Sequence, residues 1–172
     1  MINKQELIFT VDENNQPIEP LERHAAHKQG VWHRTTDIAV VNSKNEILCH
    51  KRSILKDTGP GLWDACFGGH MAPGTEAVDG AVIELGEESG LIVKPADLEF
   101  AGTVPHIQAN NKEFRYLFVY RWDGPFSDLK LEEDEVSEVK WVPIDVVRSN
   151  RENSAEWSTM PFLEMLLSKL VP

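Results

Sequence analysis

The chain has 172 residues, a length at which one hydrophobic core closes, so we expect a single domain over residues 1–172. It carries 28 Asp and Glu against 17 Lys and Arg, a formal charge of -11, and this negative field repels nucleic-acid polymers. Apolar residues make up 41% of the chain, which is enough for a real core and excludes extended disorder.

Cysteine content and hydropathy bear on the compartment. Cys49 and Cys66 are too few for a disulfide framework, which favours a reducing environment. The opening residues have no basic region followed by an apolar stretch, and nowhere do about eighteen apolar residues run together. We therefore expect a cytoplasmic protein without a membrane partner. The oligomeric state is open, with a homodimer as one option.

The first part of the chain reads as short strands and turns. We expect extended segments over residues 6–11, 36–41, 46–52 and 62–67. A turn at residues 42–45 joins the second and third of these, so that they form a hairpin. A short helix over residues 21–28 is closed by Gly30, and the last extended segment runs into Gly68 and Gly69.

The period changes after Gly69, where apolar residues recur at helical spacing. They are Ala77, Val78, Ala81, Val82 and Leu85. Thr75 is the predicted N-cap of this central helix, and Gly90 is its predicted C-terminal stop.

The remaining segments alternate again between strand and helix patterns. We expect strands over residues 99–104, 114–121 and 139–142, an acidic loop over 129–135, and helices over 145–148 and 161–170. Strands interleaved with helices predict an α/β fold in which helices cover both faces of a mixed sheet.

Three carboxylates share one face of the central helix. Glu84, Glu87 and Glu88 fall at i, i+3 and i+4, so their side chains project from neighbouring points, about a quarter-turn from the apolar stripe. Like charges at this spacing repel one another, so the cluster requires full solvation or a cation. A solvated acidic face is the ordinary alternative to a metal site.

The surrounding residues resemble the Nudix box, G-x5-E-x7-R-E-U-x-E-E-x-G-U with U aliphatic. The register is kept over residues 69–91 without a gap. Matching positions are Gly69, Glu84, Leu85, Glu87, Glu88, Gly90 and Leu91. Two positions depart from the pattern, because Thr75 stands at the first Glu and Ile83 at the Arg that pairs with the carboxylates in the family.

The resemblance extends beyond the box to the branch of Nudix proteins related to isopentenyl-diphosphate isomerase. Segments similar to that branch lie at residues 6–14, 23–28, 32–34, 51–52, 61–64, 136–142 and 161–162. The resemblance covers nearly the full chain and implies the Nudix-type α/β/α sandwich.

The resemblance also implies a chemistry, the attack of water on a diphosphate, usually a nucleoside diphosphate linked to another group. Mg²⁺ or Mn²⁺ neutralises the phosphates and positions the nucleophile. Carried over, Glu84, Glu87 and Glu88 are metal ligands and catalytic residues, with the carbonyl of Gly68 as a further ligand. Glu135 is a candidate ligand or base, and its alternative is an exposed loop acid.

Substrate contacts are less specific in the sequence. Lys51 and Arg52 are candidate phosphate-binding residues, and capping of a strand edge is their ordinary alternative. His27, His33 and His70 correspond to the metal-binding histidines of the related isomerases. We expect His33 and His70 to line the substrate cavity, with ordinary packing as the alternative.

Isomerase activity is the first alternative function. The position of the catalytic cysteine of the isomerases holds Gly68, and residues 114–122 contain no Glu-Asn-Glu-like segment to supply the second acid. A Nudix-like ligand-binding module that has lost turnover is the second alternative, motivated by Thr75 and Ile83. The sequence does not name the substrate.

Overall fold

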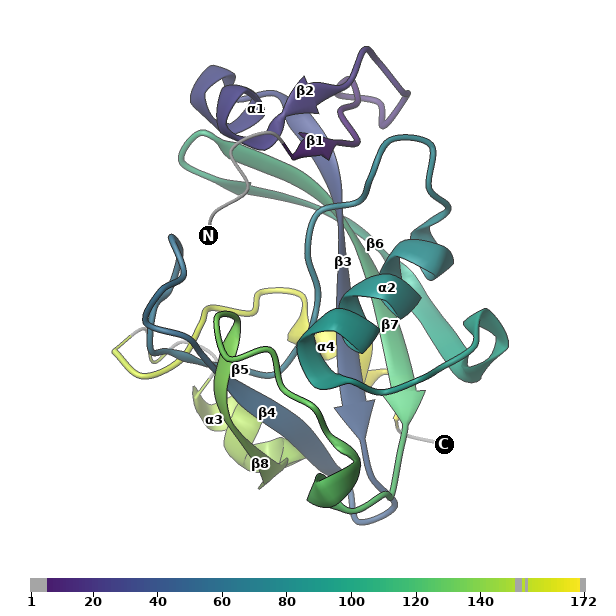
Figure 1. The fold of residues 1–172 in the computed structure, drawn as a ribbon, viewed down its shortest axis with the longest axis vertical. Coiled ribbons are helices and arrows are strands. Elements are labelled where there is room, and N and C mark those ends of the chain that lie inside the picture. The colour runs from purple at the N-terminus through teal and green to yellow at the C-terminus, as the bar shows by residue number, and fades with distance from the viewer. Residues whose placement is uncertain (1–5, 151–152, 154, 171–172) are drawn as a thin grey trace.

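The computed structural model describes residues 6–150, 153 and 155–170 (Figure 1). In chain order its elements are β1 (Leu7–Ile8), β2 (Leu21–Glu22), α1 (Arg23–Gln29), β3 (Trp32–Val41), β4 (Glu46–Arg52), β5 (Trp63–Asp64), α2 (Ala77–Ser89), η1 (Pro95–Asp97), β6 (Leu98–Gln108), β7 (Asn111–Arg121), η2 (Phe126–Asp128), β8 (Val136–Pro143), α3 (Ile144–Asn150) and α4 (Leu163–Leu167). Among the described residues, no helix is both long and apolar enough to cross a membrane.

A six-stranded mixed sheet forms the centre of the molecule. Its strand order is β5-β4-β3-β7-β6, and β8 pairs with β4. Strands β3 and β7 run parallel along the whole of β3, whereas the other pairs are antiparallel. Strands β1 and β2 form a separate two-stranded sheet near α1 (Figure 1).

Helices cover both faces of this sheet, as the sequence predicted. On one face, Leu85 of α2 packs in a core cluster with Ile38. On the other face, Leu163 of α4 packs in a second cluster with Ala39 and Leu117. The side chains of a strand alternate between faces, so neighbouring residues 38 and 39 belong to different clusters. The α/β fold with a mixed sheet is therefore confirmed.

The sheet is split between β3 and β4, and this split positions the site. The expected hairpin forms, but its one ladder pair joins Val41 and Ile47. Farther along, the chain after β5 enters the gap, where Ile38 N–H donates to Phe67 O at 2.7 Å and Thr36 N–H donates to Gly69 O at 2.9 Å. Gly68 and Gly69 are thereby brought beside α2.

The expected N-cap of α2 was wrong. The helix begins at Ala77 and its N-cap is Glu76, which makes no side-chain capping hydrogen bond. Thr75 N–H donates to Ala72 O at 3.1 Å, so Thr75 is held in the preceding turn. Gly90 ends the helix in the left-handed conformation, as predicted.

Several other boundaries differ from the expected ones because tertiary contacts set them. Of the strand expected over residues 6–11, the ladder includes Leu7–Ile8, and Thr10 and Val11 form isolated bridges. Residues 21–22 pair as β2 instead of starting the helix. The last helix is shorter than expected, because it spans Leu163–Leu167 instead of residues 161–170.

Candidate active site

The three glutamates of α2, which we call the carboxylate cluster, occupy different environments. Glu88 is 5% exposed, Glu87 is exposed, and Glu84 is intermediate. The N–H of Gly68 donates to Oε2 of Glu88 at 2.9 Å. The carboxylate of Glu84 lies so close to Gly69 that a Cβ at that position would collide with it. The cluster is therefore packed against the two glycines instead of being fully solvated.

Gly68 is required at its position for a backbone reason. Its φ is +150°, in the region that residues with side chains rarely adopt. A Cβ there would collide with the backbone carbonyl of Thr36. The glycine at the place of the isomerases' cysteine thus allows the segment after β5 to pass directly beside β3 and to present the Gly68 N–H to Glu88.

Burial makes two members of the carboxylate cluster, Glu84 and Glu88, difficult to ionise. Burial raises the pKa of Glu84 to about 8, and repulsion from Glu88 and Glu87 adds to the effect. Burial also raises the pKa of Glu88 to about 7, against the Gly68 hydrogen bond and the charge of Lys56, which lower it. A divalent cation would reverse these shifts, and carboxylate oxygens suit Mg²⁺ or Mn²⁺. The donor chemistry therefore fits such a metal, although among the described residues it is three histidines, and not these glutamates, that bring three ligand atoms within 4.8 Å of one another.

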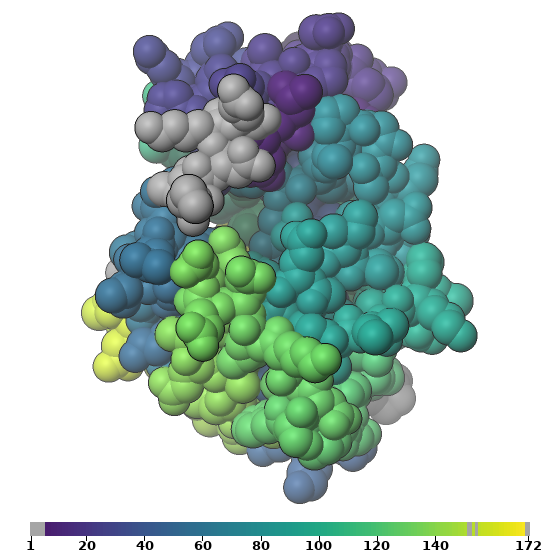
Figure 2. Space-filling model, viewed as in Figure 1, coloured from purple at the N-terminus to yellow at the C-terminus, as the bar shows by residue number. Residues whose placement is uncertain are grey.

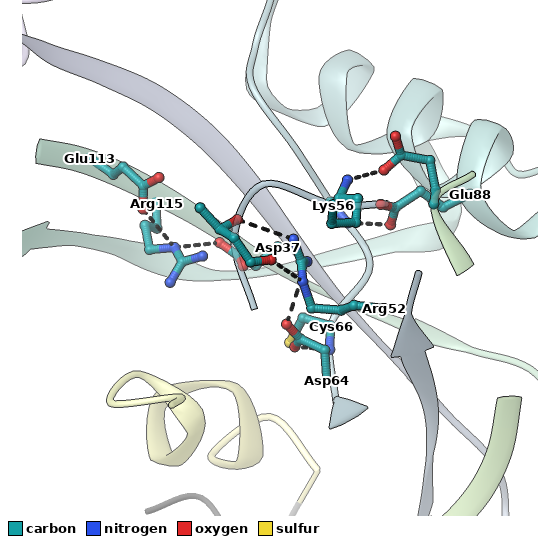
Figure 3. A network of polar contacts seen from close by, with 11 residues as sticks. Asp37, Arg52, Lys56, Asp64, Cys66, Glu88, Glu113 and Arg115 are labelled. Atoms are coloured by element: carbon teal, nitrogen blue, oxygen red, sulfur yellow. Dashed lines mark hydrogen bonds and ion pairs between the residues drawn. The ribbon is translucent and has the colours of Figure 1, made fainter. Parts of the chain in front are cut away.

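Arg52 and Lys56 lie near the carboxylate cluster, whereas Lys51, which was expected to bind phosphate there, does not. Arg52 lies close enough to lower the pKa of Glu88, with its Nη1 3.9 Å from Oδ2 of Asp64 (Figure 3). Lys51 instead lies over Trp63, with Nζ 5.9 Å from the ring centroid. Lys56, which the sequence analysis did not select, reaches toward α2 beside Glu88 (Figure 3).

Glu135 lies at the start of β8 and contacts the loop that carries Lys56. Its carboxylate forms an ion pair with Nζ of Lys56, and its carbonyl accepts the N–H of Ser53 at 2.9 Å. Its side chain is 38% exposed. The structure thus links Glu135 to the carboxylate cluster through Lys56, whose pKa responds to Glu88 and Glu84.

A second group of candidate ligands, His27, His33 and His70, is called here the histidine cluster. One ligand atom from each lies within 4.8 Å of the other two, a spacing that suits a metal ion. Nε2 of His27 is 3.1 Å from Nε2 of His70. Burial lowers the pKa of His27 to about 4 and that of His70 well below its ordinary value, with His33 adding to both.

Glu113 joins this cluster, and the sequence analysis missed it. Its Oε1 lies 3.8 Å from Nε2 of His33, and both residues are buried. Burial alone raises the pKa of Glu113, but His33, Arg115 and Asn111 outweigh it and hold the pKa at about 2. Glu113 lies one position before residues 114–122, the segment in which the sequence offers no second acid.

Arg115 lies two residues farther along β7 and is held by two carboxylates. Its Nε is 3.0 Å from Oδ2 of Asp37 and 3.4 Å from Oε2 of Glu113 (Figure 3). Burial raises the pKa of Asp37 to about 6, although Arg115 lowers it. The guanidinium also lies over the ring of Phe162, at 4.5 Å from the centroid.

A cavity of about 170 Å³ connects the two clusters. Its walls include Glu84 from the carboxylate cluster, His70 from the histidine cluster, and the apolar side chains of Leu7 and Ile83. In the space-filling view, a recess lies between α2 and the stretch that leads into β8 (Figure 2). One member of each cluster, Glu84 and His70, therefore faces the same cavity.

Comparison with known proteins identifies the family. The family model described as the NUDIX domain matches residues 31–163, which is most of the chain. The chain belongs to the Nudix family. A Nudix hydrolase of uncharacterised function from Clostridium acetobutylicum is 32% identical over 149 residues, which cover 83% of this chain and 72% of that relative.

The isomerase branch and a solved structure are also similar to this Nudix protein. An isopentenyl-diphosphate Delta-isomerase from Photorhabdus laumondii is 28% identical over 165 residues, which cover 94% of this chain and 90% of that relative. A crystal structure from Deinococcus radiodurans aligns with a TM-score of 0.76 at 18% identity, covering 95% of this chain and 98% of the other, which supports the fold alone.

Proposed function

We propose that this protein is a metal-dependent hydrolase that cleaves a diphosphate linkage in a small-molecule substrate. The observation that carries the proposal is the pair formed by the half-buried Glu84 and the buried Glu88, packed against Gly68 and Gly69 with pKa values of about 8 and 7. Buried carboxylates with raised pKa values gain most from a cation, and perturbed pKa values of this kind are frequent at functional sites.

The proposed roles follow from where each side chain lies. Glu84, Glu87 and Glu88 would hold Mg²⁺ or Mn²⁺, which when bound supplies charge neutralisation at the diphosphate and orientation of the attacking water. Gly68 fixes the carboxylate of Glu88 through its N–H. Arg52 is the candidate phosphate-binding residue, with a guanidinium that also donates to the carbonyl of Thr58 at 3.0 Å, and Glu135 is the candidate proton acceptor at the edge of the cluster.

Histidine residues line the other side of the proposed substrate site. His70 forms part of the wall of the cavity that also contains Glu84, and His33 lies behind it in the histidine cluster. Burial lowers the pKa of His70 well below its ordinary value, and a neutral imidazole can donate or accept a hydrogen bond, so His70 is suited to contact the part of the substrate beyond the diphosphate.

A phosphohydrolase screen tests this function. Substrates would include nucleotide sugars, dinucleotides, nucleoside triphosphates, coenzyme A and isoprenyl diphosphates, each with Mg²⁺ and with Mn²⁺. We expect metal-dependent release of a phosphorylated product, and its loss in Glu84→Gln and in Glu88→Gln. Tight ligand binding without turnover in any mixture would instead indicate a binding module.

One observation favours keeping isomerase-like chemistry as a second candidate. The histidine cluster with Glu113 forms a potential metal site, although Gly68 cannot supply a thiol and Arg115 stands where a second acid would follow Glu113. Double-bond migration in isopentenyl diphosphate, followed by NMR, would support this candidate over hydrolysis.

A further inference from the structure

Helix α2 contains acidic residues without any basic residue of its own. Over Ala77–Ser89 the helix has Asp79, Glu84, Glu87 and Glu88, and neither Lys nor Arg. Ile83 occupies the place of the box arginine and is 50% exposed. Any positive protein charge that balances the carboxylate cluster must therefore come from another segment.

Lys56 reaches the cluster from the loop between β4 and β5. The base of this loop is closed by backbone hydrogen bonds between Arg52 and Leu62 at 2.9 Å and between Gly61 and Arg52 at 3.1 Å. Within the loop, Lys56 N–H donates to the carbonyl of Ser53 at 3.2 Å, and Ser53 is itself bonded to Glu135. The loop backbone thus fixes the direction in which Lys56 extends.

The side chain of Lys56 lies beside Glu88 of the proposed site (Figure 3). It is 21% exposed and forms an ion pair with Glu135. Burial lowers the pKa of Lys56, and among its charged neighbours Glu88 acts most strongly in the opposite direction, with Glu84 acting in the same sense. Lys56 also lowers the pKa of both glutamates.

We propose that Lys56 takes the place of the missing box arginine as the counter-ion of the carboxylate cluster. In the metal-free protein Lys56 pairs with Glu135 and lies beside Glu88, and an incoming divalent cation competes with its charge at Glu84 and Glu88. Lys56 is thus a positioning residue that acts through Glu84, Glu88 and Glu135. This inference rests on the proposed function, because it concerns the same metal site.

Metal affinity tests the inference without relying on turnover. The dissociation constant for Mn²⁺ would be measured by calorimetry for the wild type, Lys56→Gln, Lys56→Arg and Lys44→Gln. Removing one positive charge beside the cluster should tighten Mn²⁺ binding about tenfold in Lys56→Gln. Lys56→Arg should retain the wild-type value. Lys44→Gln changes the net charge equally at an exposed turn and is the matched control.

A second-site substitution separates a counter-ion from a merely structural side chain. Ile83→Arg restores the arginine of the box at an exposed position, so it should weaken Mn²⁺ binding in the wild type. In the Lys56→Gln background it should bring the dissociation constant back toward the wild-type value. If Lys56→Gln does not fold, the change in the Mn²⁺ dissociation constant caused by Ile83→Arg alone tests the inference.

Three outcomes would overturn the inference. They are unchanged or weaker Mn²⁺ binding in Lys56→Gln, an equal change in Lys44→Gln, and no effect of Ile83→Arg on affinity. If the wild type nevertheless shows metal-dependent turnover that Glu88→Gln abolishes, the proposed function survives and the role of Lys56 alone is wrong. Mn²⁺ binding in none of the proteins would overturn both.

Discussion

The carboxylate cluster and the histidine cluster border the same cavity, and burial acts on them in opposite ways. Burial raises the pKa of Glu84 to about 8, so this side chain favours its protonated form without a cation. Burial lowers the pKa of His27 to about 4, so that imidazole stays neutral at pH 7. Both shifts have the same cause, because a low-dielectric environment disfavours the charged form of either group.

This contrast separates two kinds of metal site. Neutral imidazole is the form that binds a metal, so His27 and His70, whose pKa values are lowered, would need to lose no proton in order to bind one at neutral pH. The carboxylates must lose protons when the metal binds, so their affinity rises with pH. The following experiments test whether the two clusters differ in this way.

The largest expected effect is on turnover. Glu88→Gln removes the charge of the most buried carboxylate but retains its shape. We expect kcat/KM for the substrate identified by the screen to fall about a hundredfold or more, which corresponds to about 3 kcal/mol of transition-state stabilisation. Glu138→Gln, at an exposed residue of β8, is the control and should leave kcat/KM unchanged. Equal rates in the two variants would show that the cluster is not catalytic.

Backbone strain at Gly68 provides the next test. Gly68→Ala places a Cβ against the carbonyl of Thr36, so the loop must move and its N–H must leave Glu88. We expect the free energy of unfolding to fall by about 3 kcal/mol, measured by urea denaturation. Gly61→Ala is the matched control, because Gly61 has φ +73° and nothing within 4 Å of its Cβ position. Gly61→Ala should lower the free energy of unfolding by about 1 kcal/mol. An equal loss of stability in the two variants would exclude a clash between a Cβ at residue 68 and the carbonyl of Thr36.

The pH dependence of stability reports on the carboxylate cluster. The pKa of Glu84 is 4.5 ordinarily and about 8 in the fold, so the folded protein binds this proton more tightly than the unfolded chain. The resulting stability is complete below pH 4.5 and is lost as pH rises to 8. Relative to Glu84→Gln, the metal-free wild type should therefore lose on the order of 2 kcal/mol between these limits.

Urea denaturation of both proteins across this pH range measures the difference. Mn²⁺ added at pH 8 should stabilise the wild type more than Glu84→Gln, because the metal binds the folded, ionised cluster. A difference between the two proteins that stays constant with pH would contradict the raised pKa of Glu84.

The contribution of the histidine cluster to the pH dependence of stability should have the opposite sign and be smaller. The pKa of His27 falls from 6.5 to about 4 in the fold, so its contribution to stability is present above pH 6.5 and is lost as pH falls toward 4. Solvent screening at this partly exposed ring reduces the loss to about 0.5 kcal/mol. Compared with His27→Gln, the wild type should lose that amount on acidification in metal-free buffer. If the wild type instead lost stability relative to His27→Gln as the pH rises, the two clusters would not differ in the direction of their pH dependence.

Sequence patterns predicted most of the elements, because local spacing determines them. The helical period of residues 77–85 and the stop at Gly90 identified α2, and the apolar run at residues 36–41 identified the centre of β3. Predictions failed where a distant segment decides the conformation. Thr75 lies in a turn and not in a cap, and Leu21 pairs with Ile8 instead of starting a helix.

The residues of the candidate site that lie on one helix were predicted from the sequence, and those on other elements were not. Fixed spacing within one helix makes Glu84, Glu87 and Glu88 neighbours, so this group could be selected from the sequence. Lys56 and Glu113 have no such spacing with the groups that they contact. Their partners lie in other elements, so their positions depend on how those elements pack.

The sequence by itself determined that three carboxylates share a helical face in a box lacking its arginine, because helix geometry is local. Tertiary structure decided which carboxylate is buried, which glycine N–H binds it and which lysine approaches it. The split between β3 and β4 brings Gly68 to Glu88, and a loop fastened to β8 brings Lys56. Those are long-range contacts, and they set the charge balance of the site through burial.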